Sequence, residues 1–347
     1  MSNLEVGIVG LPNVGKSTLF NALLRKSLAA SANFPFTTIE PNVGIVPVPD
    51  DRLEKLAKVV ATTVIIPAAV KFVDIAGLVK GAAQGEGLGN KFLSHIREVD
   101  AIVHLVRDFS DPNVIKTGET PEADIATVNT ELILADLETI TKVLSAAEDD
   151  SKRSKTKIAE DKVSGLTKIK AGLDLGKLAK DVTTTDVERD ALGVLPLLTS
   201  KPQILVYNVD ENKLEGSEIR ISAKLEAELA ELSEEEAKEY LKSLEVEESG
   251  LGKLIGAAYK TLGLISYFTA GEKEVRAWTI KEGTKAPAAA GVIHTDFEKG
   301  FIKADIIAWD KLVEADGWTG ARERGWVRLE GKDYVMAEGD VAIFRFQ

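Results

Sequence analysis

The sequence predicts an α/β protein built from a mostly parallel sheet, an inserted α-helical hairpin and a small α+β domain at the C-terminal end. Short apolar segments, such as residues 6–9 and 203–207, alternate with helix-like runs, which is typical of a parallel sheet covered on both faces. Residues 126–193 contain no proline and carry apolar residues at helical spacing, which predicts the hairpin. Alternating segments after Leu264 predict the last domain.

The strands of the main predicted sheet are short and apolar, and turn residues follow them. Residues 6–9 end at Gly10, and residues 71–74 are followed by a second glycine, Gly77. Two more strands are expected at 101–106 and at 203–207. The strands expected in the last domain lie at residues 275–280, 291–293, 301–304, 334–336 and 341–346.

Composition limits the class of protein. Of 347 residues, 44% are hydrophobic and 28% are charged, the ordinary balance of a soluble globular protein. The absence of cysteine excludes disulfides, thiolate metal sites and a cysteine nucleophile. The net charge of −12 argues against a protein that coats nucleic acid by bulk charge, although a local basic face is compatible with it. No run has the length of a membrane span and no signal-peptide pattern opens the chain, so we expect a cytoplasmic protein without a membrane partner.

The segment after the first predicted strand carries a phosphate-binding motif. Residues 10–17 read GLPNVGKS and match G-x-x-x-x-G-K-[ST], directly after a strand and directly before a helix. Backbone N–H groups of such a loop and the helix N-terminus surround a phosphate. Lys16 is expected to reach the β- and γ-phosphates, and the Ser17 hydroxyl to bind Mg²⁺. The predicted nucleotide contacts of this loop are Asn13, Val14, Gly15, Lys16, Ser17 and Thr18.

A second motif supplies further phosphate and metal contacts. Residues 74–77 read DIAG and fit D-x-x-G, in which Asp74 holds Mg²⁺ through water and the Gly77 N–H meets the γ-phosphate. A threonine within residues 33–41, which read NFPFTTIEP, is expected to complete the Mg²⁺ shell when a γ-phosphate is present. We expect catalysis through phosphate and transition-state contacts from Lys16 and Gly77, with no general base assigned.

Together the patterns predict a split domain organisation. Residues 1–125 and 198–263 are expected to form a P-loop nucleotide-binding domain, and residues 126–197 the helical, coiled-coil-like insert. Residues 264–347 are expected to form the C-terminal domain. Residues 152–157 read KRSKTK and are expected near the tip of the hairpin, where they either touch phosphates or are simply solvated.

The chain resembles a known family in several places. The nucleotide-domain segments that carry the resemblance are residues 10–17, 33–42, 74–80 and 85–90. The C-terminal segments that carry it are residues 267–271, 274–279 and 294–301. They resemble the YchF/Obg-like ATPase family, a branch of the Obg group of translation-factor-class P-loop proteins. The C-terminal segments resemble its TGS domain, which implies a β-grasp-like fold for residues 264–347. The resemblance covers essentially the whole chain. It implies association with ribosomes, with RNA contacted by the insert and the TGS domain, and it favours Thr38 over Thr37 as the Mg²⁺ ligand.

The motif that selects the base departs from the guanine-reading pattern N-K-x-D. Residues 208–211 read NVDE, so the carboxylate that would read guanine belongs to Glu211 and is displaced by about one C–C bond. The family resemblance implies a preference for ATP over GTP. It also implies that the Asn208 side chain and the Val209 backbone meet adenine.

Two features leave a GTP-preferring or dual-specificity protein open. Residues Ser222, Ala223 and Lys224 form the S-A-K sequence found in guanine-specific proteins, and Lys224 can stack on either base. Asp210 is adjacent to Glu211 and is an alternative reader of guanine. A further alternative is a ribosome-binding module in which the nucleotide only stabilises the fold.

Hydrolysis is expected to be slow. Most switch GTPases place a glutamine after D-x-x-G to orient water, whereas this chain has Leu78. The resembled family often carries a histidine where our alignment places Lys116, which puts that histidine's proposed role in doubt for this chain. Several related P-loop proteins use an asparagine at the position of Asn13 to bind K⁺, which makes K⁺ a candidate second cofactor beside Mg²⁺. The alternative is that Asn13 only shapes the loop, since asparagine tolerates a left-handed backbone. We expect a monomer.

Overall fold

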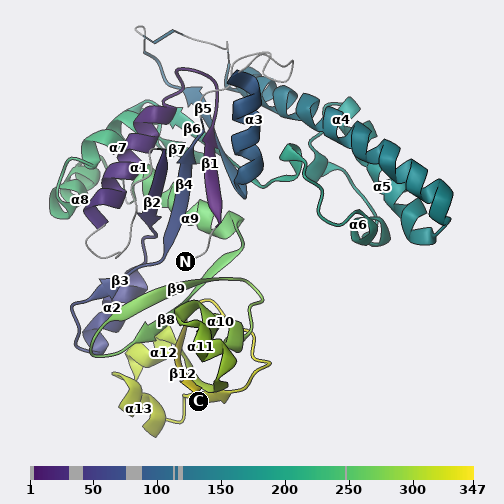
Figure 1. The fold of residues 1–347 in the computed structure, drawn as a ribbon. Helices are drawn as coiled ribbons and strands as arrows, with labels where there is room; N and C mark the ends of the chain where they lie inside the picture. Colours follow the sequence, from purple (N-terminus) through teal and green to yellow (C-terminus); the bar gives the residue numbers. More distant parts are fainter. Residues whose placement is uncertain (1–3, 31–41, 76–87, 112–113, 116–119, 247) are drawn as a thin grey trace. The chain divides into compact units, whose positions relative to one another are not determined.

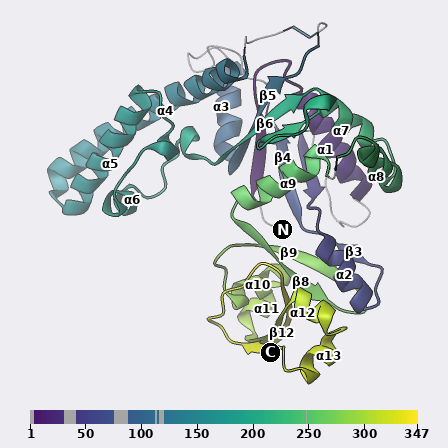
Figure 2. The same ribbon diagram turned by 180° about the vertical axis from the view of Figure 1, so that it is seen from behind.

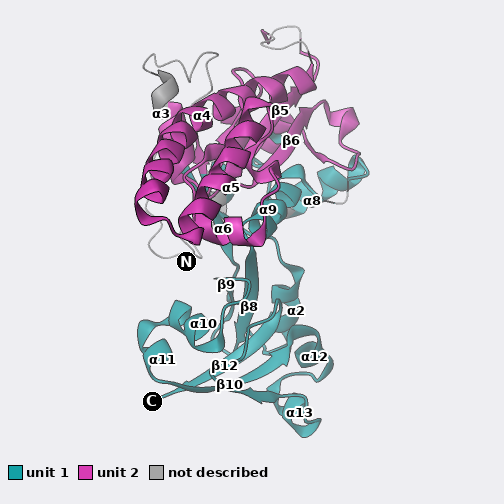
Figure 3. Cartoon of the chain, turned by 90° about the vertical axis from the view of Figure 1, so that its right-hand side faces the viewer, with its two compact units in different colours: residues 1–4, 21–72, 228–347 teal, residues 5–20, 73–227 magenta. Residues whose placement is uncertain are grey.

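The computed structural model describes residues 4–30, 42–75, 88–111, 114–115, 120–246 and 248–347. The chain divides into two compact units (Figure 3). Unit 1 comprises residues 1–4, 21–72 and 228–347, and unit 2 comprises residues 5–20 and 73–227. No described helix is both long and apolar enough to cross a membrane.

The main sheet has the strand order β2-β4-β1-β5-β6-β7 (Figure 1). Its strands are β1 (Glu5–Val9), β2 (Val43–Pro47), β4 (Ala69–Asp74), β5 (Ala101–Asp108), β6 (Gln203–Val209) and β7 (Ile219–Ile221). The pairs β1–β5, β5–β6 and β6–β7 are parallel. Seven consecutive residues of β5 are buried, as expected for a central strand that is covered on both faces. The predicted mostly parallel α/β sheet is confirmed.

Helices precede and follow these strands, as parallel connections require. They are α1 (Lys16–Ala30), α3 (Leu88–Glu98), α7 (Ala223–Leu229), α8 (Glu234–Ser243) and α9 (Gly250–Thr261). Short 3₁₀ turns lie at Ala179–Asp181, Leu198–Ser200 and Glu211–Lys213. The last of these turns begins within the base-selecting motif.

The insert is a helical hairpin, as predicted (Figure 2). It consists of α4 (Pro121–Ser154) and α5 (Lys157–Asp174), followed by α6 (Asp186–Leu192). The helix α4 starts earlier than the predicted boundary because the Thr120 hydroxyl caps it, accepting a hydrogen bond from the Ala123 N–H at 3.2 Å. At the turn, Lys155 adopts a left-handed conformation with φ 50°. Ile140 and Leu166 belong to the apolar core of the insert.

The second sheet has the strand order β11-β10-β12-β8-β9-β3. Its C-terminal strands are β8 (Leu264–Ala270), β9 (Val275–Lys281), β10 (Phe301–Ala308), β11 (Arg328–Glu330) and β12 (Asp340–Phe346). Its helices are α10 (Ala286–Ile293), α11 (Thr295–Lys299), α12 (Trp309–Glu314) and α13 (Trp318–Glu323). The expected strand at 291–293 is wrong, because the alanine-rich run that begins with Pro287 in the first turn forms α10. The expected strand at 334–336 is reduced to one isolated bridge at Val335.

Residues 51–66 join the second sheet, although the sequence analysis placed them in the nucleotide-binding domain. They form α2 (Asp51–Val59) and β3 (Ile65–Ile66), and β3 pairs in parallel with β9 at Ile65 and Val275. A two-residue strand carries no alternating pattern in the sequence, so its partner was not predictable. The other predicted domain boundaries stay predictions.

Candidate nucleotide-binding site

The loop between β1 and α1 has the backbone that the phosphate motif requires. Gly15 has φ +98° and Asn13 has φ +63°, both in the left-handed region. A Cβ on Gly10 would lie 2.4 Å from the Leu105 carbonyl oxygen, and one on Gly15 would lie 2.4 Å from Asn208 Nδ2. Both glycines are therefore required by close packing. The strand, loop and helix follow one another as predicted.

Lys16 lies buried in this loop. Its Nζ donates to the carbonyl oxygens of Gly10 at 2.9 Å and Leu11 at 2.6 Å. Burial lowers the pKa of Lys16 to about 8, and the charge of Asp74 opposes this shift. Burial likewise raises the pKa of Asp74, and the Lys16 charge opposes that shift. The two groups thus share a desolvated environment in which a phosphate or a cation would interact strongly.

The donor set around Lys16 suits Mg²⁺. Asp74 ends β4, and Ser17 and Thr18 are exposed in the first turn of α1. A carboxylate and a hydroxyl are hard oxygen ligands of the kind Mg²⁺ takes beside substrate phosphates. Among the described residues, no cluster of three or more histidine or acidic side chains forms a cage that holds a metal by itself. Several predicted site residues lie outside the described residues: Thr37, Thr38, Gly77, Leu78 and Lys116.

In the segment predicted to select the base, Asn208 connects two loops. Its side chain is buried, and Oδ1 accepts a hydrogen bond from the Ala223 N–H at 2.9 Å. Its Nδ2 donates to the Val14 carbonyl at 2.9 Å. One amide therefore ties the phosphate loop to the S-A-K segment. No pattern in the sequence indicates this role, and the expected contact of Asn208 with adenine stays a prediction.

Both carboxylates that are candidates for reading guanine have partners within the protein. Asp210 accepts from the Ser110 N–H, at 3.1 Å to Oδ1, and lies 3.5 Å from the Lys213 ammonium. Glu211 Oε1 accepts from Lys224 Nζ at 3.1 Å. These partners occupy only part of the acceptor sites of each carboxylate, but they fix its position, so the N–H groups of guanine would have to compete with them.

The other two predicted base contacts differ in what they offer. Val209 is buried, so only its backbone is available to a base. The Ser222 hydroxyl accepts from the Leu225 N–H at 3.2 Å, at the start of α7. This hydroxyl therefore shapes the S-A-K loop.

The strand β5 contributes two buried polar residues, His104 and Arg107. His104 is a packed strand residue: burial, aided by the Lys16 charge, lowers its pKa to about 4. Arg107, which the sequence analysis missed, donates to the carbonyls of Asp111 and Val114 at 3.2 Å each. Its guanidinium also stacks on the Phe109 ring, 4.4 Å from the centroid. Its signal in the sequence is an arginine near the end of a largely apolar strand.

A mostly parallel sheet with a glycine-bounded loop, a buried lysine and an aspartate at a neighbouring strand end defines a P-loop nucleotide-binding protein. Comparisons with known proteins agree. Residues 5–145 match the family described as "50S ribosome-binding GTPase". Residues 264–347 match the C-terminal family of YchF GTPases, which is described as a protein of unknown function.

Relatives match over the whole chain. The Ribosome-binding ATPase YchF of Bacillus subtilis (strain 168) is 51% identical over 364 residues, and the match covers 99% of each chain. The protein of the same name from Escherichia coli O157:H7 is 46% identical, again over 99% of each. The solved structure of the Schizosaccharomyces pombe YchF GTPase superposes with a TM-score of 0.88 at 38% identity, covering 99% of this chain and 98% of that one. The chain belongs to the YchF family, and the resemblance inferred from its motifs is confirmed.

Proposed function

We propose that this protein is a Mg²⁺-dependent nucleotide switch that binds ATP in preference to GTP, hydrolyses it slowly and associates with ribosomes. The curated relatives are named ribosome-binding ATPases, which supports both the activity and the partner. The single observation that carries the proposal is the buried Lys16 in its glycine-bounded loop, which Asn208 ties to the S-A-K segment.

The phosphate side of the site works by positioning and charge. Backbone N–H groups of the loop, with Val14 and Gly15, hold the β- and γ-phosphates at the α1 N-terminus. Lys16 exchanges the carbonyls of Gly10 and Leu11 for phosphate oxygens. Ser17, Thr38 and Asp74 are the proposed Mg²⁺ ligands, and a bound Mg²⁺ would neutralise phosphate charge. Gly77 is the proposed backbone donor to the γ-phosphate.

The base side explains the preference for adenine. Guanine presents N1–H and a 2-amino group, which need an available carboxylate acceptor. Asp210 and Glu211 are engaged by Ser110, Lys213 and Lys224 instead. Adenine does not need a carboxylate acceptor at these positions. The groups that bind it are the Asn208 side chain, the Val209 backbone and the S-A-K loop. Preferential binding of GTP is the competing outcome.

Asn13 is the proposed contact of a K⁺ ion beside the phosphates. Its side chain is exposed and its backbone is left-handed, so this residue shapes the loop while its amide oxygen stays accessible. K⁺ is therefore expected to accelerate hydrolysis over Na⁺ at equal ionic strength. Equal rates in the two salts would remove K⁺ from the proposal.

The direct test measures phosphate release from ATP by the full chain, with Mg²⁺ and with a chelator. Lys16→Ala is expected to lower kcat at least about a hundredfold, the usual loss when a donor to a developing oxyanion is removed. The same variant is then sedimented with ribosomes in the presence of ATP. If the nucleotide is only structural, Lys16→Ala lowers the melting temperature and leaves ribosome affinity unchanged. Because ribosomes lie in the cytoplasm, we infer that the protein is cytoplasmic. We also infer that it is a monomer.

A further inference from the structure

The segment that leads to Asp74 passes through the second sheet before it returns to the first. After β2 the chain forms α2 and β3, which belong to unit 1 and to the second sheet, and it then enters β4 and ends at Asp74. We call residues 50–66 the excursion. One end of the excursion follows the segment that contains Thr38, and its other end runs directly into the strand of the proposed Mg²⁺ ligand Asp74.

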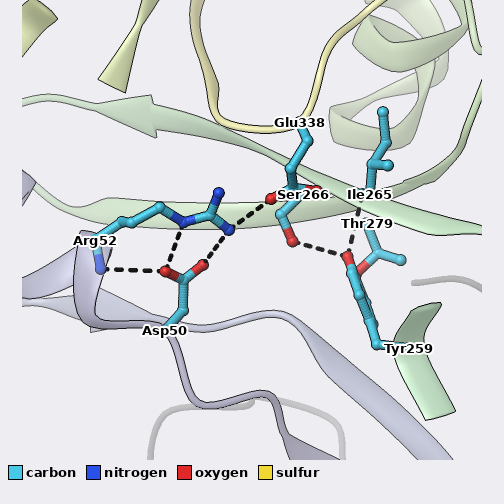
Figure 4. Close-up of polar contacts among 7 residues, drawn as sticks. All are labelled: Asp50, Arg52, Tyr259, Ile265, Ser266, Thr279 and Glu338. Carbon is cyan, nitrogen blue, oxygen red and sulfur yellow. Dashed lines mark hydrogen bonds and ion pairs between the residues drawn. The ribbon is translucent and has the colours of Figure 1, made fainter. Parts of the chain in front are cut away.

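Arg52 anchors the excursion to the C-terminal part of the sheet (Figure 4). Its Nε donates to Asp50 Oδ1 at 2.7 Å and its Nη2 to Asp50 Oδ2 at 2.8 Å, a bidentate fork. The same Nη2 lies 2.6 Å from Glu338 Oε1. The guanidinium also stacks on Phe268 of β8, 4.8 Å from the ring centroid. One side chain thus joins the excursion to β8 and to the loop before β12.

The polar contacts continue beyond Arg52 into the interior of unit 1. Glu338 Oε2 accepts from the Ser266 N–H at 2.8 Å. The Ser266 hydroxyl lies 2.8 Å from the Tyr259 hydroxyl, which is also 3.2 Å from the Thr279 hydroxyl (Figure 4). Ser266 and Tyr259 are buried, so these hydrogen bonds are protected from water. The connected groups lie on α2, β8, β9 and α9.

A second set of contacts fixes the other end of the excursion. The Val275 N–H donates to the Val64 carbonyl at 2.9 Å, next to the parallel pairing of β3 with β9. In α2, at the same end as Arg52, the Lys55 ammonium also lies over the Trp309 ring, 5.4 Å from its centroid. The excursion is therefore an integral part of the second sheet.

We propose that the excursion transmits nucleotide occupancy from Asp74 to the C-terminal sheet, with Arg52 as the positioning residue of this coupling. The inference rests on the proposed function, since a nucleotide with Mg²⁺ must engage Asp74. A ligand that shifts the position of β4 also shifts the preferred positions of β3 and α2, because the three elements follow one another directly in the chain. The coupling is reciprocal, so a partner that binds the C-terminal sheet and alters the excursion changes ATP affinity by the same factor.

The test is hydrogen–deuterium exchange of the full chain, with Mg²⁺ and a non-hydrolysable ATP analogue and without them. Peptides from β8 and β9 are expected to exchange at least about fivefold more slowly with nucleotide, the lower end of typical allosteric coupling. Arg52→Gln removes the guanidinium contacts with Glu338 and Phe268 that join the excursion to the rest of the sheet, and it is expected to reduce that protection to less than half. The matched control, Arg324→Gln, alters an arginine that stacks on Trp326 outside the excursion, and it is expected to keep the full response.

Nucleotide affinity is measured on the same samples, so that failure of the proposal is distinguishable from failure of the proposed function. If the wild-type chain binds no nucleotide, the proposed function fails and the inference fails with it. If the analogue binds and exchange in β8 and β9 is unchanged, the coupling alone is overturned. If Arg52→Gln fails to fold, Glu338→Gln replaces it, because that change leaves the Arg52–Asp50 fork intact. A full nucleotide response in the variant that folds overturns the role of Arg52.

Discussion

Asn208 joins parts of the site that look like separate motifs in the sequence. Its amide pairs with the Val14 carbonyl and the Ala223 N–H, and both hydrogen bonds are buried. Removing one partner of a buried hydrogen bond leaves the other unsatisfied, which costs about 1–3 kcal/mol per group. The asparagine therefore contributes to stability as well as to binding.

Asn208→Ala is expected to lower the free energy of unfolding by about 2–6 kcal/mol, since two buried groups lose their partner at about 1–3 kcal/mol each. It is also expected to weaken ATP binding, because the phosphate loop and the S-A-K loop lose their common anchor. Chemical denaturation and nucleotide titration measure the two effects. The control is Asn212→Ala, an exposed asparagine four residues away in sequence. Equal effects of the two substitutions would contradict the assigned role.

Lys224→Ala is expected to reduce the preference for ATP over GTP. The substitution frees the Glu211 carboxylate to accept from guanine, which raises GTP affinity. The pair is exposed, so a change of about two- to fivefold is expected, consistent with up to about 1 kcal/mol for such pairs. Competition titrations give the ratio. A shift seen instead with Lys213→Ala would identify Asp210 as the guanine reader.

At the scale of elements, the sequence was informative where periodicity or a motif is long. The hairpin follows from apolar residues at helical spacing, and the loop before α1 from an eight-residue motif. Short elements were missed: β3 has two residues and finds its partner in β9, far along the chain. The last residues of α10 are predicted to be a strand because Val292 and Ile293 are β-branched, and a run this short fits both patterns.

The hydrogen bonds of Glu188 at the start of α6 predict that the stability of the fold depends on pH. Glu188 forms a capping box with Thr185 and accepts from Lys168 and Ser164. The hydrogen bond from Lys168, followed by those from the Thr185 N–H and Ser164, lowers the pKa of Glu188 to about 2. In the unfolded chain the pKa of a glutamate is about 4.3. Because the pKa of Glu188 is lower in the folded state, its ionised carboxylate stabilises the fold at pH values above about 4.3. This stabilisation is lost as pH falls through that value toward 2.

Glu188→Gln is therefore expected to lower the melting temperature at pH 7, with the difference from wild type shrinking between about pH 4.5 and pH 2. Thermal unfolding followed by circular dichroism checks this. Glu160→Gln, an exposed glutamate in the first turn of α5, is the control and should show little difference at either pH. A Glu188→Gln difference that stays constant down to pH 2 would contradict the assigned pKa.

At the scale of the whole molecule, neither compact unit is a single continuous segment of the sequence. The unit that contains the C-terminal strands also contains residues 21–72. The order of the motifs predicted the architecture and the family. The excursion could not be predicted because its anchoring contact, Arg52 with Glu338, joins positions that are far apart in sequence.

A fragment of residues 264–347 is accordingly expected to be much less stable than the same strands in the full chain. It lacks β3, which leaves the β9 edge unpaired, and it lacks Arg52 over Phe268. Two-dimensional NMR of the fragment, with and without a fused 50–66 segment, measures this. A well-dispersed spectrum and a cooperative melt of the fragment alone would contradict the expectation.

Nucleotide selection is the central claim of this account. The most direct measurement is displacement of a fluorescent nucleotide by ATP and by GTP, with Mg²⁺ and K⁺ present. ATP is expected to displace the probe at concentrations at least about tenfold lower than GTP, a difference of about 1.4 kcal/mol. Displacement by GTP at the lower concentration would show that Asp210 or the S-A-K loop reads guanine, and it would make the protein a GTPase despite Glu211.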